Sequence, residues 1–337
     1  MEIRQNYSLK KYNTFGFDVL ADYFAQPVSI DEIKEILSVI RAKQLPLLIV
    51  GKGSNLLFCD NFHGIVIAPQ IMGIDKISED SDSVFLKVGA GVVWDDFVQH
   101  AVNNGWGGIE NLSLIPGCVG ASPIQNIGAY GVEAKDTIFE VEYIEIATGE
   151  KKTISNVDCK FGYRDSVFKH ELQNKVIVTH VVFRLNKKPV LYTHYGNIEE
   201  ELATYSSKTI ATVRDVIIAI RQKKLPDPSE IGNAGSFFKN PMVSKQQAEA
   251  ILAVDEKMQI YPVDEKSVKL PAARLIELAG WKGKRVGNVG VHEQQALVLV
   301  NYGQGTGKEI LDLARAIQQS VHEKFGVMLE LEVNIVK

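Results

Sequence analysis

A serine hydroxyl, a lysine and an amide stand close together in the stretch Ile231–Pro241. Two glycines and an alanine precede Ser236, so the backbone and the hydroxyl can approach a ligand closely. Two phenylalanines then supply apolar walls, and Lys239 and Asn240 add a cation and an amide. A few convergent polar groups in an apolar setting are the usual composition of a small-molecule site. We therefore expect such a site here; the alternative is a tight glycine turn that enters a buried edge strand.

A second candidate is the glycine-rich loop Gly51–Leu57, which follows a short, fully apolar strand predicted over residues 46–50. Its glycines and Ser54 suit backbone N–H groups that wrap a phosphate. The loop lacks the dinucleotide-binding fingerprint of the Rossmann fold, because Leu56 stands where glycine or alanine is required. It is not a P-loop either.

Another glycine-rich stretch, Gly303–Lys308, also departs from the P-loop pattern. Tyr302 stands in place of the first P-loop glycine, and Glu309 replaces the serine or threonine that holds magnesium. We predict a turn there, followed by a helix over residues 308–324.

The longest stretch without periodicity runs from Gly105 to Gly131. Long ordered loops in compact domains are usually functional. Within it, residues 115–131 combine several glycines with two adjacent amides, Gln125 and Asn126. Such side chains and backbone groups can pair with the polar edge of a flat heterocycle.

Two charged residues are ambiguous on pattern alone. Arg164 is followed by Asp165, and an isolated pair of this kind is more often a local ion pair than a catalytic group. Glu332 lies in the alternating segment Val327–Val336, on the polar face of a predicted strand. On pattern alone, a half-exposed strand with a solvated acidic face is the favoured interpretation.

Periodicity and end signals predict the elements that position these residues. Ser29 and Glu32 form a capping box before an amphipathic helix, and Ser244 with Gln247 caps another. Further helices are predicted over residues 94–104, 197–205, 213–224 and 271–278. Strands are predicted over residues 65–68, 84–88, 139–146, 176–185 and 296–301, of which 176–185 should be buried on both faces.

Composition restricts the class of protein. With 337 residues, 45% hydrophobic and 23% charged, the chain is an ordinary globular sequence of two or three domains. A net charge of -4 without basic runs excludes a nucleic-acid footprint. Its apolar runs are too short to cross a bilayer, and the N-terminus lacks the apolar region of a signal peptide, so we expect a cytoplasmic protein. Cys59, Cys118 and Cys159 have neither disulfide-framework nor zinc-site spacing, so free thiols and no metal are expected.

These motifs together resemble the UDP-N-acetylenolpyruvoylglucosamine reductases, bacterial flavoenzymes commonly called MurB. The resemblance runs from Tyr12–Gly16 to the last predicted strand and keeps both order and spacing. The segments that carry it are Gly51–Leu57, Ile115–Gly131, Tyr163–Ser166, Lys224–Pro228, Gly232–Pro241 and Leu329–Val333. The segment around Tyr195 resembles the longer class of the family, in which this loop folds over the substrate.

The resemblance implies an α+β protein with a vanillyl-alcohol-oxidase-type FAD-binding fold. It implies two FAD-binding subdomains, residues 1–70 with the closing strand 327–337 and residues 71–190. A third α+β domain, residues 191–326, would bind the UDP-sugar.

The resemblance also implies roles for individual residues. The catalytic residues would be Arg164, Ser236 and Glu332. The cofactor-binding residues would be Gly51, Lys52, Gly53, Ser54, Asn55, Leu56, Pro116, Gly117, Gly120, Gln125, Asn126 and Gly128. The substrate-binding residues would be Tyr195, Lys224, Asn240 and Gln295. Lys52 stands where many relatives have glycine or glutamate, which leaves its contact with phosphate open.

The implied activity is NADPH-dependent reduction of the enolpyruvyl ether of UDP-N-acetylglucosamine through non-covalent FAD, by a monomer. Two alternatives remain open at this stage. A flavin oxidase or dehydrogenase of the same fold would work without NADPH, and Cys118 near the flavin loop could tether its flavin. A non-catalytic nucleotide-sugar sensor would not reoxidise its flavin on adding substrate.

Overall fold

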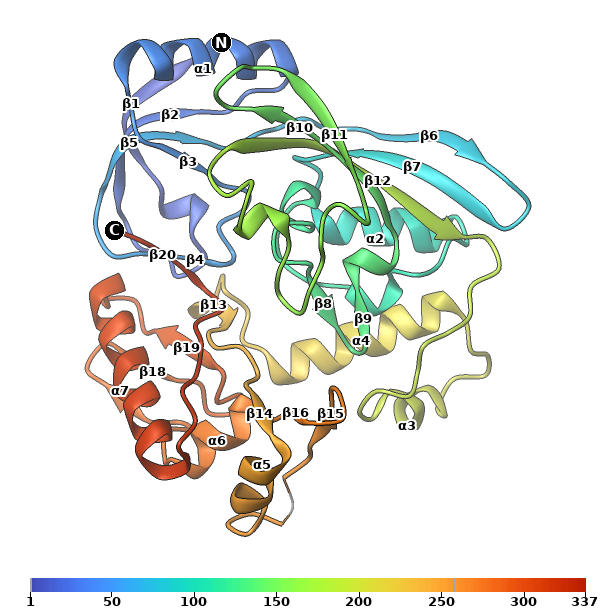
Figure 1. Cartoon of the computed structure of the whole chain (residues 1–337), viewed down its shortest axis with the longest axis vertical. Coiled ribbons are helices and arrows are strands. Elements are labelled where there is room, and N and C mark those ends of the chain that lie inside the picture. Colours follow the sequence, from blue (N-terminus) through green and yellow to red (C-terminus); the bar gives the residue numbers. More distant parts are fainter. Residues whose placement is uncertain (1, 257) are drawn as a thin grey trace. The chain divides into compact units, whose positions relative to one another are not determined.

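The computed structural model describes residues 2–256 and 258–337, and its elements fall into two compact units (Figure 1). The first unit comprises Met1–Tyr7, Leu20–Lys52 and Phe62–Arg221, and the second comprises Ser8–Val19, Gly53–Asn61 and Gln222–Lys337. The chain therefore passes more than once from one unit to the other. The three-domain division with boundaries at residues 70 and 190 stays a prediction.

The first unit contains a four-stranded sheet covered by one helix. Its strands, in the order β1-β2-β5-β3, are Ile3–Ser8, Leu20–Ala25, Phe62–Ile67 and Leu47–Ile49. Helix α1, Ile30–Lys43, buries Ile33, Ile36, Leu37 and Ile40 in the core of this layer. The predicted cap is confirmed, because Ser29 Oγ accepts a hydrogen bond from the Glu32 N–H. The Glu32 carboxylate accepts from Val28 N–H at 2.9 Å.

A five-stranded antiparallel sheet forms the second layer of the first unit. Its order is β11-β10-β12-β7-β6, with bounds Lys151–Ser155, Ile138–Glu145, Val176–Asn186, Ser83–Gly89 and Ile74–Glu79. Most of β12 is buried along both faces, as predicted. Helix α2, Trp94–Asn103, packs here through Trp94 and Phe97 against Phe183.

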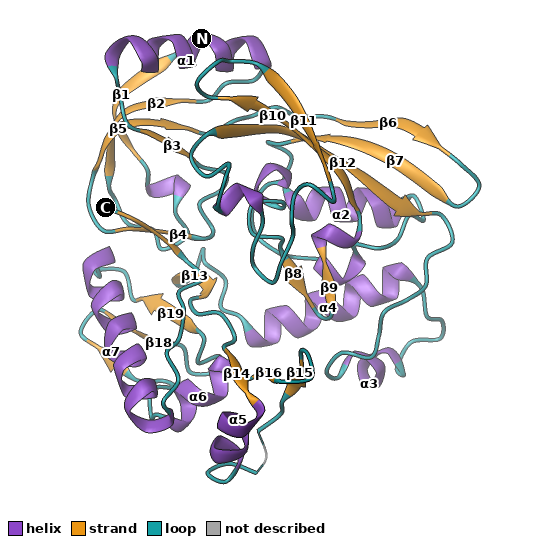
Figure 2. Cartoon of the chain, in the orientation of Figure 1, coloured by secondary structure: helices purple, strands orange, loops and turns teal. Residues whose placement is uncertain are grey.

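The remaining elements of the first unit are short or lie near its C-terminal end. They are β8 Gly128–Ala129, β9 Val132–Glu133, α3 Ile198–Leu202 and α4 Ile210–Lys224, whose last residues belong to the second unit. Between α2 and β8 the chain is mostly loop, with short helical turns at Glu110–Leu112 and Val119–Ala121 (Figure 2). This confirms the predicted absence of periodicity.

The described residues of the second unit include two sheets of three or more strands and three α-helices. The larger sheet has the order β13-β19-β18-β17, with bounds Gly232–Ser236, Val298–Asn301, Val289–Val291 and Arg285–Val286. The smaller has the order β14-β16-β15, with bounds Met242–Ser244, Ser267–Lys269 and Tyr261–Pro262. The helices are α5 Lys245–Leu252, α6 Ala272–Leu278 and α7 Gly307–Phe325, and α5 has the predicted Ser244 cap. Side chains of these elements share one hydrophobic core.

The glycine-rich stretch before α7 serves packing and helix capping. Thr306 and Glu309 form a reciprocal capping box, so Glu309 caps a helix where a P-loop would bind magnesium. A Cβ at Gly307 would lie 1.9 Å from Phe58 O. Only glycine fits that close approach, and the predicted turn before a helix is confirmed.

The closing strand predicted over residues 327–336 is wrong as one element. Only β20, Asn334–Val336, is a strand, paired in parallel with β4, Leu56–Phe58. Leu331 instead forms an isolated bridge with Phe238. The segment thus changes partner near Val333, which alternation alone could not reveal.

No helix within the described ranges is long and apolar enough to cross a membrane. Within the same ranges, no group of histidine, cysteine and acidic side chains is placed to hold a metal ion. Cys59, Cys118 and Cys159 are free thiols.

Candidate functional site

In the first unit, Arg164 lies at the centre of a tight turn. The turn closes through Gly162 N–H to Asp165 O at 3.0 Å, and Arg164 has a left-handed backbone with φ 53°. Such a conformation is uncommon for a residue with a side chain and often marks a functional site. Arg164 Nη2 donates to Gly128 O at 2.7 Å, and Asp165 pairs with His170 at 2.8 Å. The guanidinium is therefore fixed against the predicted cofactor loop.

Two further hydrogen bonds hold the Arg164 turn to that loop. Ser166 Oγ donates to Ile124 O at 2.6 Å, and Asn126 Nδ2 donates to Gly162 O at 2.9 Å. Residues 124–128 and 162–166, which are distant in sequence, therefore form one local structure.

The Asn126 side chain is engaged within the protein, and its role in pairing with a heterocycle stays a prediction. Besides the bond to Gly162, Nδ2 donates to Glu133 Oε2 at 3.0 Å, and Oδ1 accepts from Lys135 N–H at 3.0 Å. Both N–H donors of this buried side chain are thus used within the protein. Its side chain shapes the loop that presents its neighbours.

The two predicted cofactor segments of the first unit meet at Cys118. A Cβ at Gly51 would lie 3.5 Å from Cys118 Sγ, and the backbone of Lys52 hydrogen-bonds the thiol. Burial raises the pKa of Cys118, and the nearby Lys52 charge offsets this only in part. The thiol is thus kept protonated, whereas tethering a flavin would require a reactive thiolate.

The tyrosine segment predicted to cover the substrate is anchored to the same loop. Asn111 Nδ2 donates to Tyr192 O at 2.8 Å and to Tyr130 O at 3.2 Å. Tyr195 meets Tyr130 edge to face, with ring centroids 6.1 Å apart. Tyr195 itself is 40% exposed, so its ring is held at one edge and open to solvent elsewhere.

Tyr130 is in turn held from α4. It has φ 50° and a hydrogen bond to Arg221, and burial raises the pKa of its hydroxyl despite that cation. A second α4 residue, Arg214, makes a two-pronged ion pair with Asp95 of α2, at 2.7 and 2.8 Å. Asp95 also accepts from Leu114 N–H at 2.5 Å. These contacts fix the start of the loop and the base of the tyrosine segment.

In the second unit, Ser236 ends β13 beside an irregularity in the sheet. Asn233 pairs with Val300 and Ser236 with Val298, which breaks the regular register between them. Gly235 has φ 67°, and its N–H donates to Asn233 Oδ1 at 2.9 Å. The stretch is thus a glycine turn in an edge strand, and that turn leaves Ser236 partly exposed; its role in a small-molecule site stays a prediction.

Glu332 lies on the segment that pairs with the residues after Ser236. Glu332 N–H donates to Phe237 O at 2.9 Å, and Lys239 N–H donates to Glu330 O at 2.9 Å. Glu332 is only partly buried. The structure thus brings two predicted catalytic residues, 96 positions apart in the chain, onto adjacent backbone segments of one unit.

The predicted substrate-binding residues of the second unit differ in burial and in hydrogen bonding. Asn240 Oδ1 accepts from Ala272 N–H at 2.9 Å at the start of α6, which fixes the orientation of its amide. Gln295 is partly buried in the turn before β19, and Lys224 is exposed at the end of α4.

The part of the glycine-rich loop in the second unit, Gly53–Leu56, has close backbone packing. A Cβ at Gly53 would lie 1.8 Å from Tyr12 O, and Gly53 has φ 70°. With the partly exposed Ser54 and Asn55 beside it, the loop supplies small residues and hydrogen-bond donors suited to a diphosphate. The donor set therefore fits a dinucleotide cofactor such as FAD.

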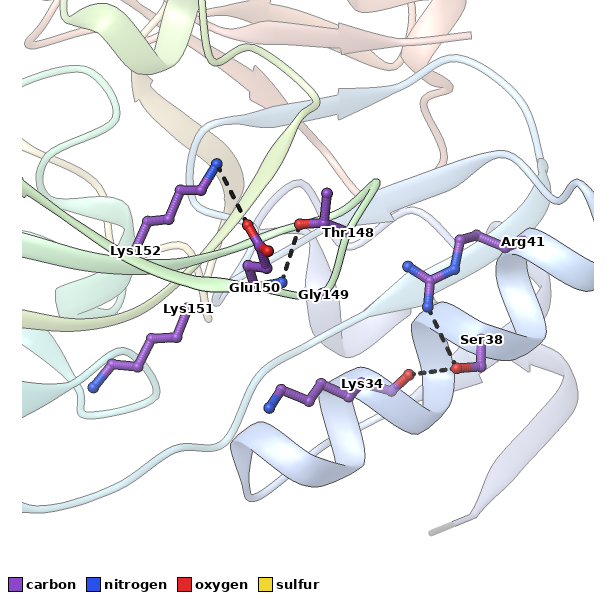
Figure 3. Close-up of a pocket in the computed structure, with 8 residues that line it drawn as sticks. All are labelled: Lys34, Ser38, Arg41, Thr148, Gly149, Glu150, Lys151 and Lys152. Carbon is purple, nitrogen blue, oxygen red and sulfur yellow. Dashed lines mark hydrogen bonds and ion pairs between the residues drawn. The ribbon is translucent and has the colours of Figure 1, made fainter.

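A hollow of about 580 Å³ in the first unit contains none of the predicted site residues. It lies between α1 and the β10–β11 hairpin and is lined by Lys34, Ser38, Arg41 and residues 148–152 (Figure 3). Lys151 and Lys152 are already paired with Glu142 and Glu145. Arg41 donates to the backbone carbonyls of residues 146 and 147, so it fastens the hairpin to the helix.

Sequence reasoning missed several residues that hold the predicted site segments in place. Asn111, Tyr130 and Asn233 are polar residues whose roles depend on contacts distant in sequence. Only the clustering of Asn, Tyr and Gly in the predicted loops could have indicated them.

Comparison with known proteins identifies two domain families in the chain and a full-length relative. Residues 227–336 match the family described as UDP-N-acetylenolpyruvoylglucosamine reductase, C-terminal domain, and residues 21–155 match an FAD binding domain. The UDP-N-acetylenolpyruvoylglucosamine reductase of Flavobacterium johnsoniae is 48% identical, over 100% of both chains.

Solved structures give the same result at the level of the fold. The UDP-N-acetylenolpyruvylglucosamine reductase (MurB) of Thermus caldophilus superposes with a TM-score of 0.69 and 27% identity, covering 100% of this chain and 98% of that one. A p-cresol methylhydroxylase, at 13% identity and a TM-score of 0.50 over 94% of this chain and 82% of that one, shares the fold alone. The expected α+β, vanillyl-alcohol-oxidase-type fold is confirmed.

Proposed function

Because the chain belongs to the UDP-N-acetylenolpyruvoylglucosamine reductase family, we propose that it reduces the enolpyruvyl ether of UDP-N-acetylglucosamine to UDP-N-acetylmuramate, using FAD and NADPH. The observation that carries this reaction onto the structure is the pairing of the segment after Ser236 with the segment that bears Glu332. A hydroxyl and a carboxyl on adjacent backbone segments can serve one small substrate from two sides. The reaction belongs to the synthesis of peptidoglycan precursors.

FAD, when bound, supplies hydride chemistry, with NADPH as the source of the hydride. The residues proposed to hold it are Gly51–Leu56, Pro116, Gly117, Gly120, Gln125 and Gly128, together with the backbone of Asn126. Small residues and close backbone packing in these segments support the assignment. The protonated Cys118 supports non-covalent binding.

The catalytic residues act on the enolpyruvyl group. Hydride adds to its terminal methylene carbon, and negative charge develops on the carboxylate as an enolate. Arg164 binds this carboxylate, and the carboxyl group of Glu332 is the second hydrogen-bond partner of the enolate. One fixed donor at developing charge contributes ~2.7–4 kcal/mol.

Ser236 completes the reduction by delivering a proton from Oγ to the carbon adjacent to the methylene. The double bond becomes a D-lactyl ether, and NADPH becomes NADP⁺. Ser236 regains its proton from solvent, which its partial exposure permits.

Tyr195, Lys224, Asn240 and Gln295 bind the UDP-sugar in this proposal. In this proposal the chain belongs to the longer class of the family, in which the segment that carries Tyr195 closes over the substrate. Its anchored base at Tyr192 and its exposed ring suit that motion. We further propose that the protein is a cytoplasmic monomer.

The direct test is product analysis. Purified protein is incubated without oxygen with NADPH and enolpyruvyl-UDP-N-acetylglucosamine, and the nucleotide sugars are resolved by mass spectrometry. We expect one NADPH consumed for each UDP-N-acetylmuramate formed. Unchanged UDP-sugar with intact NADPH would exclude the activity.

A further inference from the structure

A ring of hydrogen bonds in the second unit joins the proposed cofactor loop to two of the proposed catalytic residues. Three parts of the chain take part: the loop Gly53–Asn55, the N-terminal segment Tyr12–Phe17 and the two paired segments that carry Ser236 and Glu332. All three lie within one compact unit, although the sequence separates them by up to about 320 residues.

The first side of the ring runs through Thr14. Its N–H donates to Gly53 O at 3.3 Å, and its carbonyl accepts from Asn233 N–H at 3.0 Å. Gly232 packs against the same segment, because a Cβ there would lie 2.2 Å from Phe15 O. Asn301 Nδ2 also donates to Phe15 O, at 2.9 Å. The loop and β13 therefore have a common backbone partner.

The second side of the ring runs through Asn55. Its side-chain Nδ2 donates to Glu332 O at 3.2 Å. Its own carbonyl accepts from the N–H of Asn334 at 3.1 Å and from Nδ2 of the same residue at 3.2 Å. Asn55 thus hydrogen-bonds the backbone on both sides of Val333. At Val333 the segment changes its pairing partner from Phe238 to β4.

Glu332 lies where the segment changes its pairing partner. Residues 332 and 333 are not in a sheet, and the Glu332 N–H donates to Phe237 O, so the Asn55 bond to Glu332 O acts at a point outside regular strand pairing. A short amide side chain has few rotamers, so its bond fixes the carbonyl of Glu332 more firmly than a long side chain would.

We propose that Asn55 is a positioning residue for Glu332: its side chain sets the place of the carboxyl from which the enolate receives its hydrogen bond. This rests on the proposed function for its catalytic consequence. Beyond its place in the cofactor loop, Asn55 then has a second task, and the ring couples the order of that loop to the position of Glu332.

The test is a double-mutant cycle on FAD-loaded protein. Asn55 also lies in the proposed cofactor loop, so both half-reactions are measured at saturating FAD. Asn55→Ala should slow substrate-driven flavin reoxidation about tenfold more than it slows flavin reduction by NADPH, the ratio that corresponds to one hydrogen bond. In a Glu332→Gln background, the same Asn55→Ala change should cost less than about twofold, because residues that act as a unit are not additive. An equal loss in both backgrounds would overturn the proposal.

A second readout needs neither cofactor nor activity. In protein without FAD, the backbone amide of Glu332 should exchange with deuterium several-fold faster in Asn55→Ala than in the wild type. Unchanged exchange overturns the positioning role. Should the wild-type protein fail to reduce the substrate, the proposed function falls, but this exchange measurement still decides whether Asn55 positions Glu332.

The matched control is Asn334→Ala on the same segment. It removes an exposed amide whose acceptor, Asn55 O, keeps the Asn334 backbone donor, so reoxidation and Glu332 exchange should stay near wild type. If Asn55→Ala does not fold, Asn55→Asp preserves the shape and removes the donor, and the same cycle applies. A control as impaired as the Asn55 variant would contradict a specific role for Asn55.

Discussion

At the scale of single residues, Ser236 is defined by the glycine turn that presents it. Gly235 takes a left-handed conformation, and Asn233 accepts its N–H, so the serine hydroxyl does not need to close the turn itself. Ser236→Ala keeps the backbone and nearly all of the volume. The variant should therefore fold, bind FAD and be reduced by NADPH at close to the normal rate.

The expected defect of Ser236→Ala is confined to the half-reaction in which the substrate reoxidises the flavin. Flavin reoxidation by enolpyruvyl-UDP-N-acetylglucosamine should fall ~10²-fold or more, the lower range for loss of a positioned general acid. Anaerobic stopped-flow on each half-reaction, with a melting curve as control, measures this. Normal reoxidation would remove Ser236 as the proton donor, and equal slowing of both half-reactions would indicate a structural role.

Glu332 should contribute more to stabilisation of the transition state than to binding of the substrate. Glu332→Gln retains the shape of the side chain, so equilibrium binding of the substrate should change little. Single-turnover reoxidation should slow by ~10²-fold, comparable to loss of one donor in an oxyanion hole. A variant that binds weakly but reacts at the normal rate would show that Glu332 is a binding residue instead.

Residue types were predictable from sequence, but their partners were not. Arg164 was identified beside Asp165, yet its guanidinium donates to Gly128 O, and Asp165 pairs with His170. Asn126 was identified by its amide, and that amide is used to brace the loop. Roles that depend on contacts 30 or more residues away leave no local pattern.

At the scale of elements, the tyrosine segment is anchored at Tyr192 and open at Tyr195. Tyr195→Ala should weaken UDP-sugar binding while NADPH still reduces the flavin at nearly the normal rate, because a lid residue serves the second ligand more than the first. We expect about a tenfold rise in the dissociation constant, equivalent to one hydrogen bond to a charged group. Stopped-flow traces of both half-reactions provide the measurement, and parallel losses in both would make Tyr195 a structural residue.

The Asp95–Arg214 pair joins α2, α4 and the start of the cofactor loop, and it predicts a pH dependence. Burial alone would raise the pKa of Asp95, but hydrogen bonds from Arg214 and from Leu114 N–H bring it below its ordinary value of 3.8. A carboxyl with a lowered pKa stabilises the fold above its ordinary pKa. That contribution disappears as the pH falls through the lowered value.

Asp95→Asn should therefore reduce the free energy of unfolding at pH 7 by roughly 2 kcal/mol, less than the ~3–5 kcal/mol of a fully buried broken pair. The difference between variant and wild type should shrink between about pH 4 and pH 3, the region below the ordinary carboxyl pKa. Denaturant titrations at several pH values test this. A difference that stays constant down to pH 3 would show that the charge of Asp95 is not the cause.

Element positions followed well from sequence where the pattern was helical. Helices α2 and α7 begin and end close to the predicted residues, and α1 begins at its predicted cap, Ser29. Apolar periodicity marks all three helices, and capping side chains mark α1 and α7. Strands were harder, since the segment after Val327 alternates perfectly and still changes partner at Val333. The N-terminal strands β1 and β2 gave no clear alternation and were missed.

At the scale of the whole molecule, the proposed cofactor residues are shared between two compact units. The chain leaves the first unit within the glycine-rich loop, between Lys52 and Gly53. The fold class followed from the family resemblance, whereas this division of the loop could not be read from the sequence.

The central claim is that this flavoprotein passes electrons from NADPH to an enolpyruvyl UDP-sugar. The most direct measurement is the flavin absorbance of the purified protein without oxygen. NADPH should bleach the yellow spectrum, and enolpyruvyl-UDP-N-acetylglucosamine should then restore it. A spectrum that stays bleached with this substrate and returns only when oxygen is admitted would contradict the claim and identify a different flavoprotein.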